Sequence, residues 1–456
     1  ARDGYMLAHV DGIRVDDQGV LHVHIVEGIV EDIVPAGNKK TRDKVITREF
    51  VQKKGKPFNK FLVRRSVERV YNLGFFDDVN VRMLPGDQDP NNVIIEIDVL
   101  EHKTGTITLG AGYSKSDGLM GIIEFGEDNF RGTGDKFKVH WEIGGKKKYK
   151  NYQISYLKPW IDSKGTSLGF SFFNREDEYT DYNEDGNEVA EYNKKSRGFN
   201  ISFGRQTGEY TRDYLTLESR KDTYKWDSDD SSGYRYDTDA ISNTTGSGND
   251  WNNTNPSTGG SWNFASNNYV KNNFGRINSI TWQKVYDSRD NIYDPTRGRR
   301  ISYTAQWAGH GLGGDFDFYK FTAEARMYKK LGAKNVLAFR ARGGFIQGDA
   351  PYSQLFTLGG ADSLRGYEDD QFRGKYMYNA TLEFRFPIVK KVSGVLFTDI
   401  GDAWDAPNVT WYNSKKTFNY GVGAGVRITT PIGPVKLDYG VGKHKNKFHF
   451  SFGTQF

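Results

Sequence analysis

The sequence predicts a mainly β protein, a sixteen-stranded antiparallel transmembrane β-barrel preceded by an α+β domain of order β-α-α-β-β. Three observations lead to this fold. From about residue 103 onward, apolar or aromatic residues alternate with polar ones, and no helical period is present. Aromatic residues make up 14% of the 456 residues, yet no apolar run approaches the roughly 20 residues that a membrane-spanning helix needs. Before residue 103, strand and helix patterns follow one another.

The composition agrees with a barrel and excludes several other classes. A mean hydropathy of −0.70 is expected when strands of about 10 residues carry apolar side chains only at every second position. The net charge of +5 is spread along the chain without a basic block, so nucleic acid is not the expected partner. The chain has no Cys, which excludes a disulfide scaffold and Cys-based metal sites. We expect no cofactor and no metal.

The first hundred residues contain one complete α+β unit and a fragment of another. The chain opens on ARDGY without a signal peptide, so we expect a mature protein or part of a longer one. Three regions are predicted. Residues 1–27 form the last two strands of a preceding repeat, residues 28–101 form the complete unit, and residues 102–456 form the barrel. The expected elements are a strand over 21–35, a helix capped by Thr41 or Asn38 and running to Val51, a helix capped by Asn59 and ended by Gly74, and strands over 79–84 and 93–100.

The barrel region contains sixteen alternating segments. In residues 136–143, for example, Phe137, Val139 and Trp141 share one face, and charged or polar residues share the other. An even number is typical of single-chain bacterial barrels. A soluble sandwich would explain any one strand equally well, but the number of such segments, sixteen, favours a membrane barrel. The strands are expected to begin near residues 105, 118, 136, 149, 166, 196, 210, 272, 299, 316, 333, 375, 392, 418, 433 and 446.

The connections between these segments differ in length from one side to the other. Most even-numbered connections are short, as in outer-membrane barrels with short periplasmic turns and long external loops. This asymmetry predicts that the α+β region lies on the periplasmic side. Residues 225–271 are rich in Asn, Ser, Gly, Asp and Thr, which predicts an exposed loop without a core of its own. The long connections are expected at about 177–195, 225–271, 347–374 and 401–417.

Residue patterns for other chemistry are weak. His22 and His24 lie two apart on a predicted strand and could face a metal, but no third ligand is in view, and a zinc site needs at least three. Gly309–Gly313 and Gly132–Lys136 are glycine-rich, yet neither joins a strand to a helix as a phosphate loop does. G-x-S-x-G is absent, although an outer-membrane hydrolase with a spatially assembled triad stays open.

Several strings resemble those of one protein family. Residues 364–367, Leu364-Arg365-Gly366-Tyr367, are similar to the RGF/RGY motif of BamA-type outer-membrane assembly factors, and Phe397–Gly401 resembles the F-x-D-x-G element of that superfamily. GNKKTRDKVI from Gly37 and NLGFF from Asn72 are similar to its terminal POTRA domain. Further similar strings are Gly110–Tyr113, Glu127–Gly132, Glu383–Ile388 and Gly421–Asp438.

The resemblance implies a function without a chemical reaction. It implies a non-enzymatic factor of the bacterial outer membrane, with its POTRA region in the periplasm, that folds and inserts other outer-membrane β-barrels. The implied partners are unfolded barrel clients, periplasmic chaperones, accessory assembly subunits and the lipid bilayer. It also implies that the loop with Arg365 folds into the barrel, where Arg365 meets Asp399, flanked by Phe397 and Gly401. From the residues alone, a solvated Arg365 is the simpler interpretation.

Physical reasoning points to a seam between the first and last strands. A closed barrel has no free edge, so a client strand can add only where two strands pair poorly. Gly105, Gly110 and Gly112 weaken the first strand. The last strand places Phe448, Phe450, Phe452 and Phe456 on one face. We expect the lateral seam between residues 105–113 and 446–456.

Three other functions stay open. A secretion pore of the same superfamily, of the two-partner secretion or translocation and assembly module type, is the main alternative. An unrelated porin or enzyme barrel does not explain the POTRA-like unit. A soluble sandwich is the most remote possibility, and solubility without detergent would reveal it.

Overall fold

A computed structural model describes residues 3–114, 118–144, 149–182, 188–225, 235–236, 274–291, 294–406, 415–430, 433–443 and 445–452. Within them, no helix is long and apolar enough to cross a membrane. By its internal contacts the chain divides into two units. The first contains Ala1–Ala111, Gly121–Trp141 and Ile154–Pro159, and the second contains the remainder. The predicted regions 1–27, 28–101 and 102–456 stay predictions.

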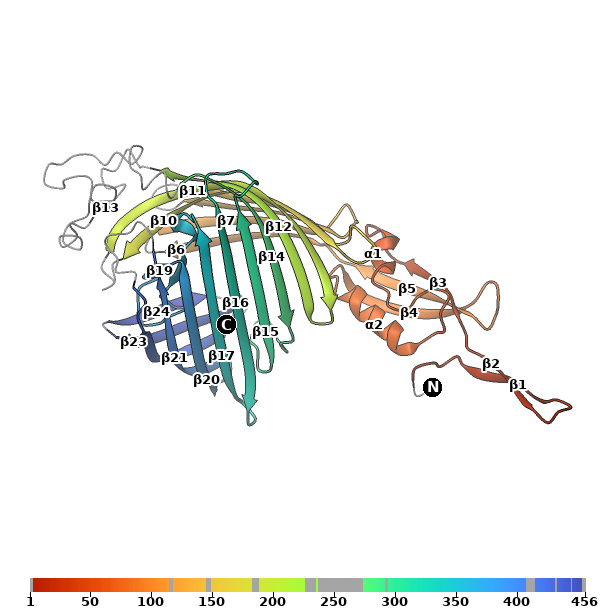
Figure 1. Ribbon diagram of the computed structural model, residues 1–456. Helices are drawn as coiled ribbons and strands as arrows, with labels where there is room; N and C mark the ends of the chain where they lie inside the picture. The colour runs from red at the N-terminus through yellow and green to blue at the C-terminus, as the bar shows by residue number, and fades with distance from the viewer. Residues whose placement is uncertain are drawn as a thin grey trace. The chain divides into compact units, whose positions relative to one another are not determined.

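The α+β region has the predicted order of elements. Three strands form a mixed sheet of order β3-β5-β4, in which β3 runs parallel to β5 and β4 antiparallel to it (Figure 1). A separate hairpin, β1 and β2, precedes it. The elements are β1 (His9–Val15), β2 (Leu21–Val26), β3 (Val30–Ala36), α1 (Asp43–Thr47), α2 (Lys60–Tyr71), β4 (Phe76–Pro85) and β5 (Val93–Glu101).

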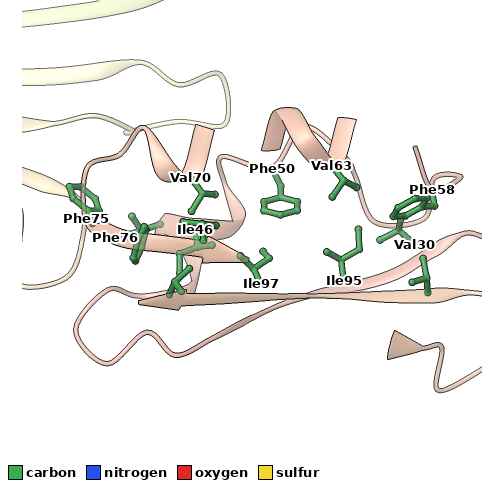
Figure 2. Packing of buried hydrophobic residues seen from close by; sticks show 14 residues of the cluster. Val30, Ile46, Phe50, Phe58, Val63, Val70, Phe75, Phe76, Ile95 and Ile97 are labelled. Atoms are coloured by element: carbon green, nitrogen blue, oxygen red, sulfur yellow. The ribbon is translucent and has the colours of Figure 1, made fainter. Parts of the chain in front are cut away.

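A compact apolar core holds this region together. The buried residues of the two helices lie over one face of the sheet, where Val63 and Val70 of α2 face Ile95 and Ile97 of β5 (Figure 2). Ile95 and Ile97 are fully buried because β5 is the central strand and one face of it is covered. Burying such side chains stabilises the domain by about 1.5–3 kcal/mol each.

The cap of the second helix was predicted correctly. Asn59 is the N-cap of α2, and its Oδ1 accepts hydrogen bonds from the N–H groups of Phe61 and Leu62 at 3.0 and 3.4 Å. The first helix differs from the prediction. It spans only Asp43–Thr47, and its N-cap is Arg42, not Thr41 or Asn38. The Thr41 hydroxyl accepts a hydrogen bond from Asn129 and does not cap the helix.

The predicted strand over residues 21–35 is two strands. β2 ends at Val26 and β3 begins at Val30. Between them, Gly28 has a φ of +63°, a left-handed conformation that interrupts an extended chain. The two halves belong to different sheets. The apolar alternation in the sequence continues across this break, which only Gly28 marks.

Sixteen strands form one antiparallel sheet, as predicted, and the two-residue β13 (Arg235–Tyr236) pairs with the end of β11. Because β6 and β24 fall largely in different units, closure between them stays a prediction. The strands are β6 (Gly105–Ser114), β7 (Gly118–Phe130), β8 (Asp135–Gly144), β9 (Tyr149–Lys158), β10 (Ser167–Tyr182), β11 (Glu188–Gly208), β12 (Thr211–Lys225), β14 (Arg276–Asp287), β15 (Gly298–Ala308), β16 (Phe318–Leu331), β17 (Asn335–Gly348), β20 (Tyr376–Val389), β21 (Val392–Trp404), β22 (Asn419–Thr430), β23 (Gly433–Gly442) and β24 (Asn446–Phe452).

Most of the connections follow the predicted asymmetry, with one correction. Only two residues separate β11 from β12, and three separate β16 from β17. The loop predicted at 177–195 is mostly strand, because β10 continues to Tyr182 and β11 begins at Glu188. Their backbones stay paired although the side chains there are charged, which made the segment resemble a loop. Most of the predicted loop over 225–271 lies outside the described residues.

The two faces of the sheet carry side chains in the reverse of the usual soluble arrangement. Aromatic residues such as Trp307, Tyr319 and Phe345 are exposed, whereas charged residues such as Glu324 and Arg340 are buried. A soluble sandwich buries its apolar face instead. The exposed aromatic face is what a lipid-facing surface requires, and the buried polar face is the inner face of the sheet.

Candidate functional site: a charge network under the loop between β17 and β20

The loop between β17 and β20 packs on the inner face of the sheet. It contains a short 3-10 turn (Tyr352–Gln354) and a two-stranded sheet of β18 (Phe356–Leu358) and β19 (Phe372–Gly374). Lys320 of β16 holds its first half, since its Nζ donates to the Gln354 carbonyl at 2.7 Å and lies 4.7 Å from the centre of the Phe356 ring. The predicted motif, Leu364 to Tyr367, is buried in its second half.

Arg365 lies in a pocket of three carboxylates. Its Nε and Nη2 donate to the two oxygens of Asp399 on β21, at 2.7 and 2.8 Å, and its backbone N–H donates to the same side chain at 3.1 Å. Its Nη1 donates to Glu383 on β20 at 2.7 Å and lies 3.4 Å from Asp438 on β23. A planar guanidinium suits such forked recognition of carboxylates. One loop residue therefore bonds to three strands.

The network is electrically balanced. Arg385 of β20 binds Glu383 with its Nε at 2.9 Å, and Arg427 of β22 binds Asp438 at 2.5 and 3.0 Å. Three arginines thus face three carboxylates, all of them almost fully buried. Burial alone would lower the pKa of Arg365, but the charge and hydrogen bonds of Asp399, with Glu383 and Asp438, raise it well above its ordinary value. The guanidinium is always charged.

Phe397 and Gly401 shape the floor of the site. The Arg365 guanidinium carbon lies 3.4 Å from the centre of the Phe397 ring, which is a cation–π contact. A Cβ on Gly423 would lie 2.6 Å from that ring, and a Cβ on Gly401 would lie 2.8 Å from the Tyr378 carbonyl oxygen. Both glycines leave the space that the ring and the neighbouring backbone occupy.

Gly366 brings the loop backbone against the last two strands. Its φ is +97°, and its N–H donates to Nε2 of His449 on β24 at 3.0 Å. A Cβ on Gly366 would lie 2.6 Å from the Gly442 nitrogen, and a Cβ on Gly440 would lie 2.5 Å from the Gly366 nitrogen. Since Nε2 accepts this hydrogen bond, the His449 ring is neutral and carries its proton on Nδ1.

Tyr367 and Glu368 complete the attachment. The Tyr367 hydroxyl donates to the Tyr420 carbonyl and accepts from the Lys443 N–H, both at 3.1 Å. Glu368 forms an ion pair with Lys447 of β24. The motif and Glu368 are therefore bonded to the strands β20, β21, β22, β23 and β24, and also to Lys443 in the segment that follows β23.

Two cavities adjoin the loop. The smaller, about 20 Å³, lies beside Arg365, Glu383 and Asp399 and is large enough for one water. The larger, about 500 Å³, lies between β17, the loop and β24. Its lining mixes Arg340, Arg342, Asp369, Asp370 and His449, so its chemistry suits water and polar groups and does not suit an apolar ligand.

The structure brings Arg365 and Asp399 together, and the sequence analysis missed other members of the network. Glu383, Arg385, Arg427 and Asp438 stood in strings noted for their family resemblance, yet without a role. His449 stood in none of these strings. Their alternating positions showed that they share a face, but which strands bring them together depends on the register of β20 to β24.

The predicted seam residues lie on β6 and β24. Gly105, Gly110 and Gly112 belong to β6, and Phe448 and Phe450 are exposed on β24. Phe452 ends β24, and Phe456 lies outside the described residues. The seam itself stays a prediction.

The other candidate groups have ordinary partners. His22 bonds to Asp16 at 2.8 Å, and His24 lies 3.3 Å from Asp11. Among the residues that the structure describes, no three potential metal ligands gather. Asp402, on the same strand as Asp399, accepts hydrogen bonds from the N–H of Thr417 and from Asn419.

Comparison with known families decides the classification. Residues 129–456 match the Omp85 superfamily domain. The chain belongs to the Omp85 superfamily. Residues 29–102 match the POTRA family, described as a surface antigen variable number repeat. The family and the POTRA domain place this Omp85 protein in the outer membrane, with its POTRA region in the periplasm.

Relatives within the superfamily include BamA proteins. The outer membrane protein assembly factor BamA of Nitratidesulfovibrio vulgaris is 26% identical over 456 residues, covering 94% of this chain and 51% of the relative. That of Neisseria meningitidis serogroup B is 26% identical over 496 residues, covering 96% of this chain and 58% of the relative. The chain thus spans about half the length of these curated relatives.

Solved structures share the fold. BamA from Haemophilus ducreyi lacking POTRA domains 1–3 superposes with a TM-score of 0.70 at 20% identity, covering 99% of this chain and 90% of that one. CdiB from Escherichia coli gives a TM-score of 0.64 at 14% identity, covering 99% and 80%.

Proposed function

We propose that this Omp85 protein is an outer-membrane protein assembly factor, which folds and inserts client β-barrels without a chemical reaction of its own. The observation that carries the proposal is the attachment of the Arg365 loop to β20–β24. It braces the last strands from the inside, so that the end of the sheet at β24 stays ordered without depending on a strong partner at its outer edge. The relatives named as assembly factors support the same function.

In this proposal a client strand adds at the seam between β6 and β24. A strand edge offers unpaired N–H and C=O groups, and β-augmentation satisfies them. The glycines of β6 favour such exchange because they weaken pairing and packing. The partners are unfolded barrel clients, periplasmic chaperones, accessory assembly subunits and the lipid bilayer. Nucleic acid is not a partner.

Depletion of the full-length protein in its host tests the function. Outer-membrane proteins are then quantified by mass spectrometry. If many unrelated β-barrels fall together, the assembly function stands. If a single exported protein accumulates in the periplasm while the barrels stay at normal levels, the assembly function is wrong.

A secretion pore is the second candidate, and the CdiB folds support it. The same depletion separates the two functions, because a dedicated pore serves one exported protein.

A disulfide lock tests the seam. The chain has no Cys, so one engineered pair is unambiguous. We expect Gly110→Cys with Phe452→Cys to stop client assembly when oxidised and to restore it when reduced. Ala325→Cys with Ala341→Cys, which joins register partners inside the sheet, is the matched control and should leave assembly intact. Full activity of the oxidised seam variant would remove the gate.

A further inference from the structure

Two strings far apart in the sequence meet in the first unit. One is the segment before and within α1, residues 37–46, and the other is the turn between β7 and β8, residues 131–134 with its flanks. The first belongs to the POTRA domain and the second to the barrel sheet. Neither has a role in the Arg365 network.

The two backbones are in direct contact. The Arg42 N–H donates to the Gly132 carbonyl at 2.9 Å. Gly132 has a φ of +71°, and a Cβ on it would lie 1.8 Å from the Lys40 carbonyl oxygen. Gly134, with a φ of +73°, would place a Cβ 2.5 Å from Nη2 of Arg48. At Gly132 the nearest atom belongs to the backbone, so no other residue type fits there without moving one of the segments.

Buried polar groups join the two segments. Asn129 and Thr41 are 1% and 3% exposed. The Asn129 Nδ2 donates to the Thr41 hydroxyl at 2.8 Å, and its Oδ1 accepts from the Gly134 N–H at 2.8 Å. Separating the segments would leave these groups buried without partners or would require water to enter.

Two carboxylates extend the contact along the chain. Glu101, the last residue of β5, accepts the N–H groups of Lys39, Lys40 and Thr41 at 3.0, 2.9 and 2.6 Å. Glu127 of β7 accepts Lys40 Nζ at 3.0 Å and also the hydroxyl of Thr104, a buried residue just before β6. Only three residues separate β5 from β6. A hinge between domains usually has an exposed linker with few contacts, which is the opposite of this arrangement.

We infer that the POTRA domain, β6 and the β7–β8 hairpin move as one rigid body, joined through Thr41, Asn129 and Gly132. Any force on the POTRA domain therefore reaches β6 directly. The link concerns the chain's mechanics alone. Its use in opening the seam rests on the proposed function, because β6 forms one side of that seam.

Hydrogen exchange of the full chain in lipid nanodiscs tests the link. In the wild type, we expect strong protection of the N–H groups of Arg42 and Gly134. Asn129→Ala should raise exchange at both segments at least tenfold, whereas α2, remote from the contact, should stay unchanged. Fast exchange at Arg42 in the wild type would overturn the inference.

Gly132→Ala tests the close approach. It should raise exchange at residues 40–42 of the POTRA domain. Gly332→Ala, in the turn between β16 and β17, is the matched control, because Gly332 has a φ of +62° with no atom within 4 Å of a Cβ. It adds a comparable backbone strain without touching the POTRA domain. Equal exchange at 40–42 in both variants would contradict the inference.

A covalent replacement of the link separates the mechanics from the function. Thr41→Cys with Asn129→Cys should lose protection when reduced and regain it when oxidised. Client assembly should likewise fall when the pair is reduced and recover when it is oxidised. If oxidation abolishes assembly, the junction must open during the cycle and the rigid-body inference is wrong. If protection follows oxidation while depletion of the protein leaves barrel levels normal, the link stands and the proposed function fails.

Discussion

The carbonyl oxygen of Arg365 occupies the space where a side chain on Gly421 would begin, since a Cβ on Gly421 would lie 1.9 Å from it. On the next strand, a Cβ on Gly440 would lie 2.5 Å from the Gly366 nitrogen. The loop and the inner faces of β22 and β23 therefore meet backbone to backbone. Small residues on the sheet are as necessary for this contact as the charges are.

Gly421→Ala should displace the loop. Overpacking of this kind typically costs about 1–3 kcal/mol. We expect the variant to lose its folded mobility in detergent electrophoresis at a lower temperature than the wild type. Gly343→Ala on β17 is the control, because its Cβ would meet its nearest atom at an ordinary 3.8 Å. Identical melting of the two variants would show that the loop does not press on β22.

Replacing Arg365 or Asp399 should destabilise the protein severely. Arg365→Ala leaves three buried carboxylates facing two arginines, and breaking a buried pair costs on the order of 3–5 kcal/mol. The exposed pair of Arg205 with Asp162, 2.6 Å apart, is a suitable comparison, since solvent screens exposed ion pairs and they contribute little to stability. Heat-induced unfolding and cellular barrel levels are the measurements. Normal growth and normal barrel levels with both Arg365 and Asp399 replaced would refute a role for the pair.

The ion pair between Glu368 and Lys447 ties the loop to β24 and allows a charge reversal test. Lys447→Glu should loosen β24 by placing two carboxylates together, and adding Glu368→Lys should restore the attraction. Hydrogen exchange of β24 reports the effect, with β16 as internal reference. Failure of the double variant to recover protection would mean that the pair does not hold the strand.

The contact between β5 and the segment before α1 should weaken in acid. Burial disfavours the Glu101 carboxylate, but hydrogen bonds from Thr41, Lys40 and Lys39 outweigh it and hold the pKa of Glu101 below its ordinary value. Such a group stabilises the folded state above its unfolded pKa, about 4.3, and the stabilisation disappears as the pH falls through the folded pKa.

We therefore expect protection factors at residues 39–41 to fall below about pH 4.3. Glu101→Gln should have low protection at every pH and no such transition. Exchange in α2 measured in the same samples controls for general acid unfolding. A Glu101→Gln variant that keeps the wild-type transition would assign it to another carboxyl group.

Much of the architecture was predictable because strands have a side-chain period of two. The alternation located all sixteen strands, most of them within a few residues of where they begin. It did not reveal that β10 extends to Tyr182 and that β11 begins at Glu188, because residues 177–182 and 188–195 are rich in polar and charged residues and lack a regular apolar alternation. The short α1 was also missed, since Thr41 serves the contact with Asn129 and is not a helix cap.

The site was predictable only in part. Arg365 and Asp399 stood in strings with a family resemblance. Arg427 and Asp438 also stood in such a string, and His449 in none, but the sequence did not reveal their contacts, because these depend on the pairing of Gly425 with Asp438 and of Asp438 with His449. Residue spacing along one strand contains no information about which residue of the next strand lies opposite.

The three carboxylates around Arg365 have a consequence for how the chain itself reaches its fold. Glu383, Asp399 and Asp438 come from three strands, and a slip of one residue in any of them would turn its carboxylate to the opposite face, toward lipid. Arg365 can then find its full set of acceptors only when β20, β21 and β23 are aligned. Docking of the loop therefore stabilises the correct strand alignment selectively, because a misaligned sheet would leave the Arg365 cation without its full set of acceptors.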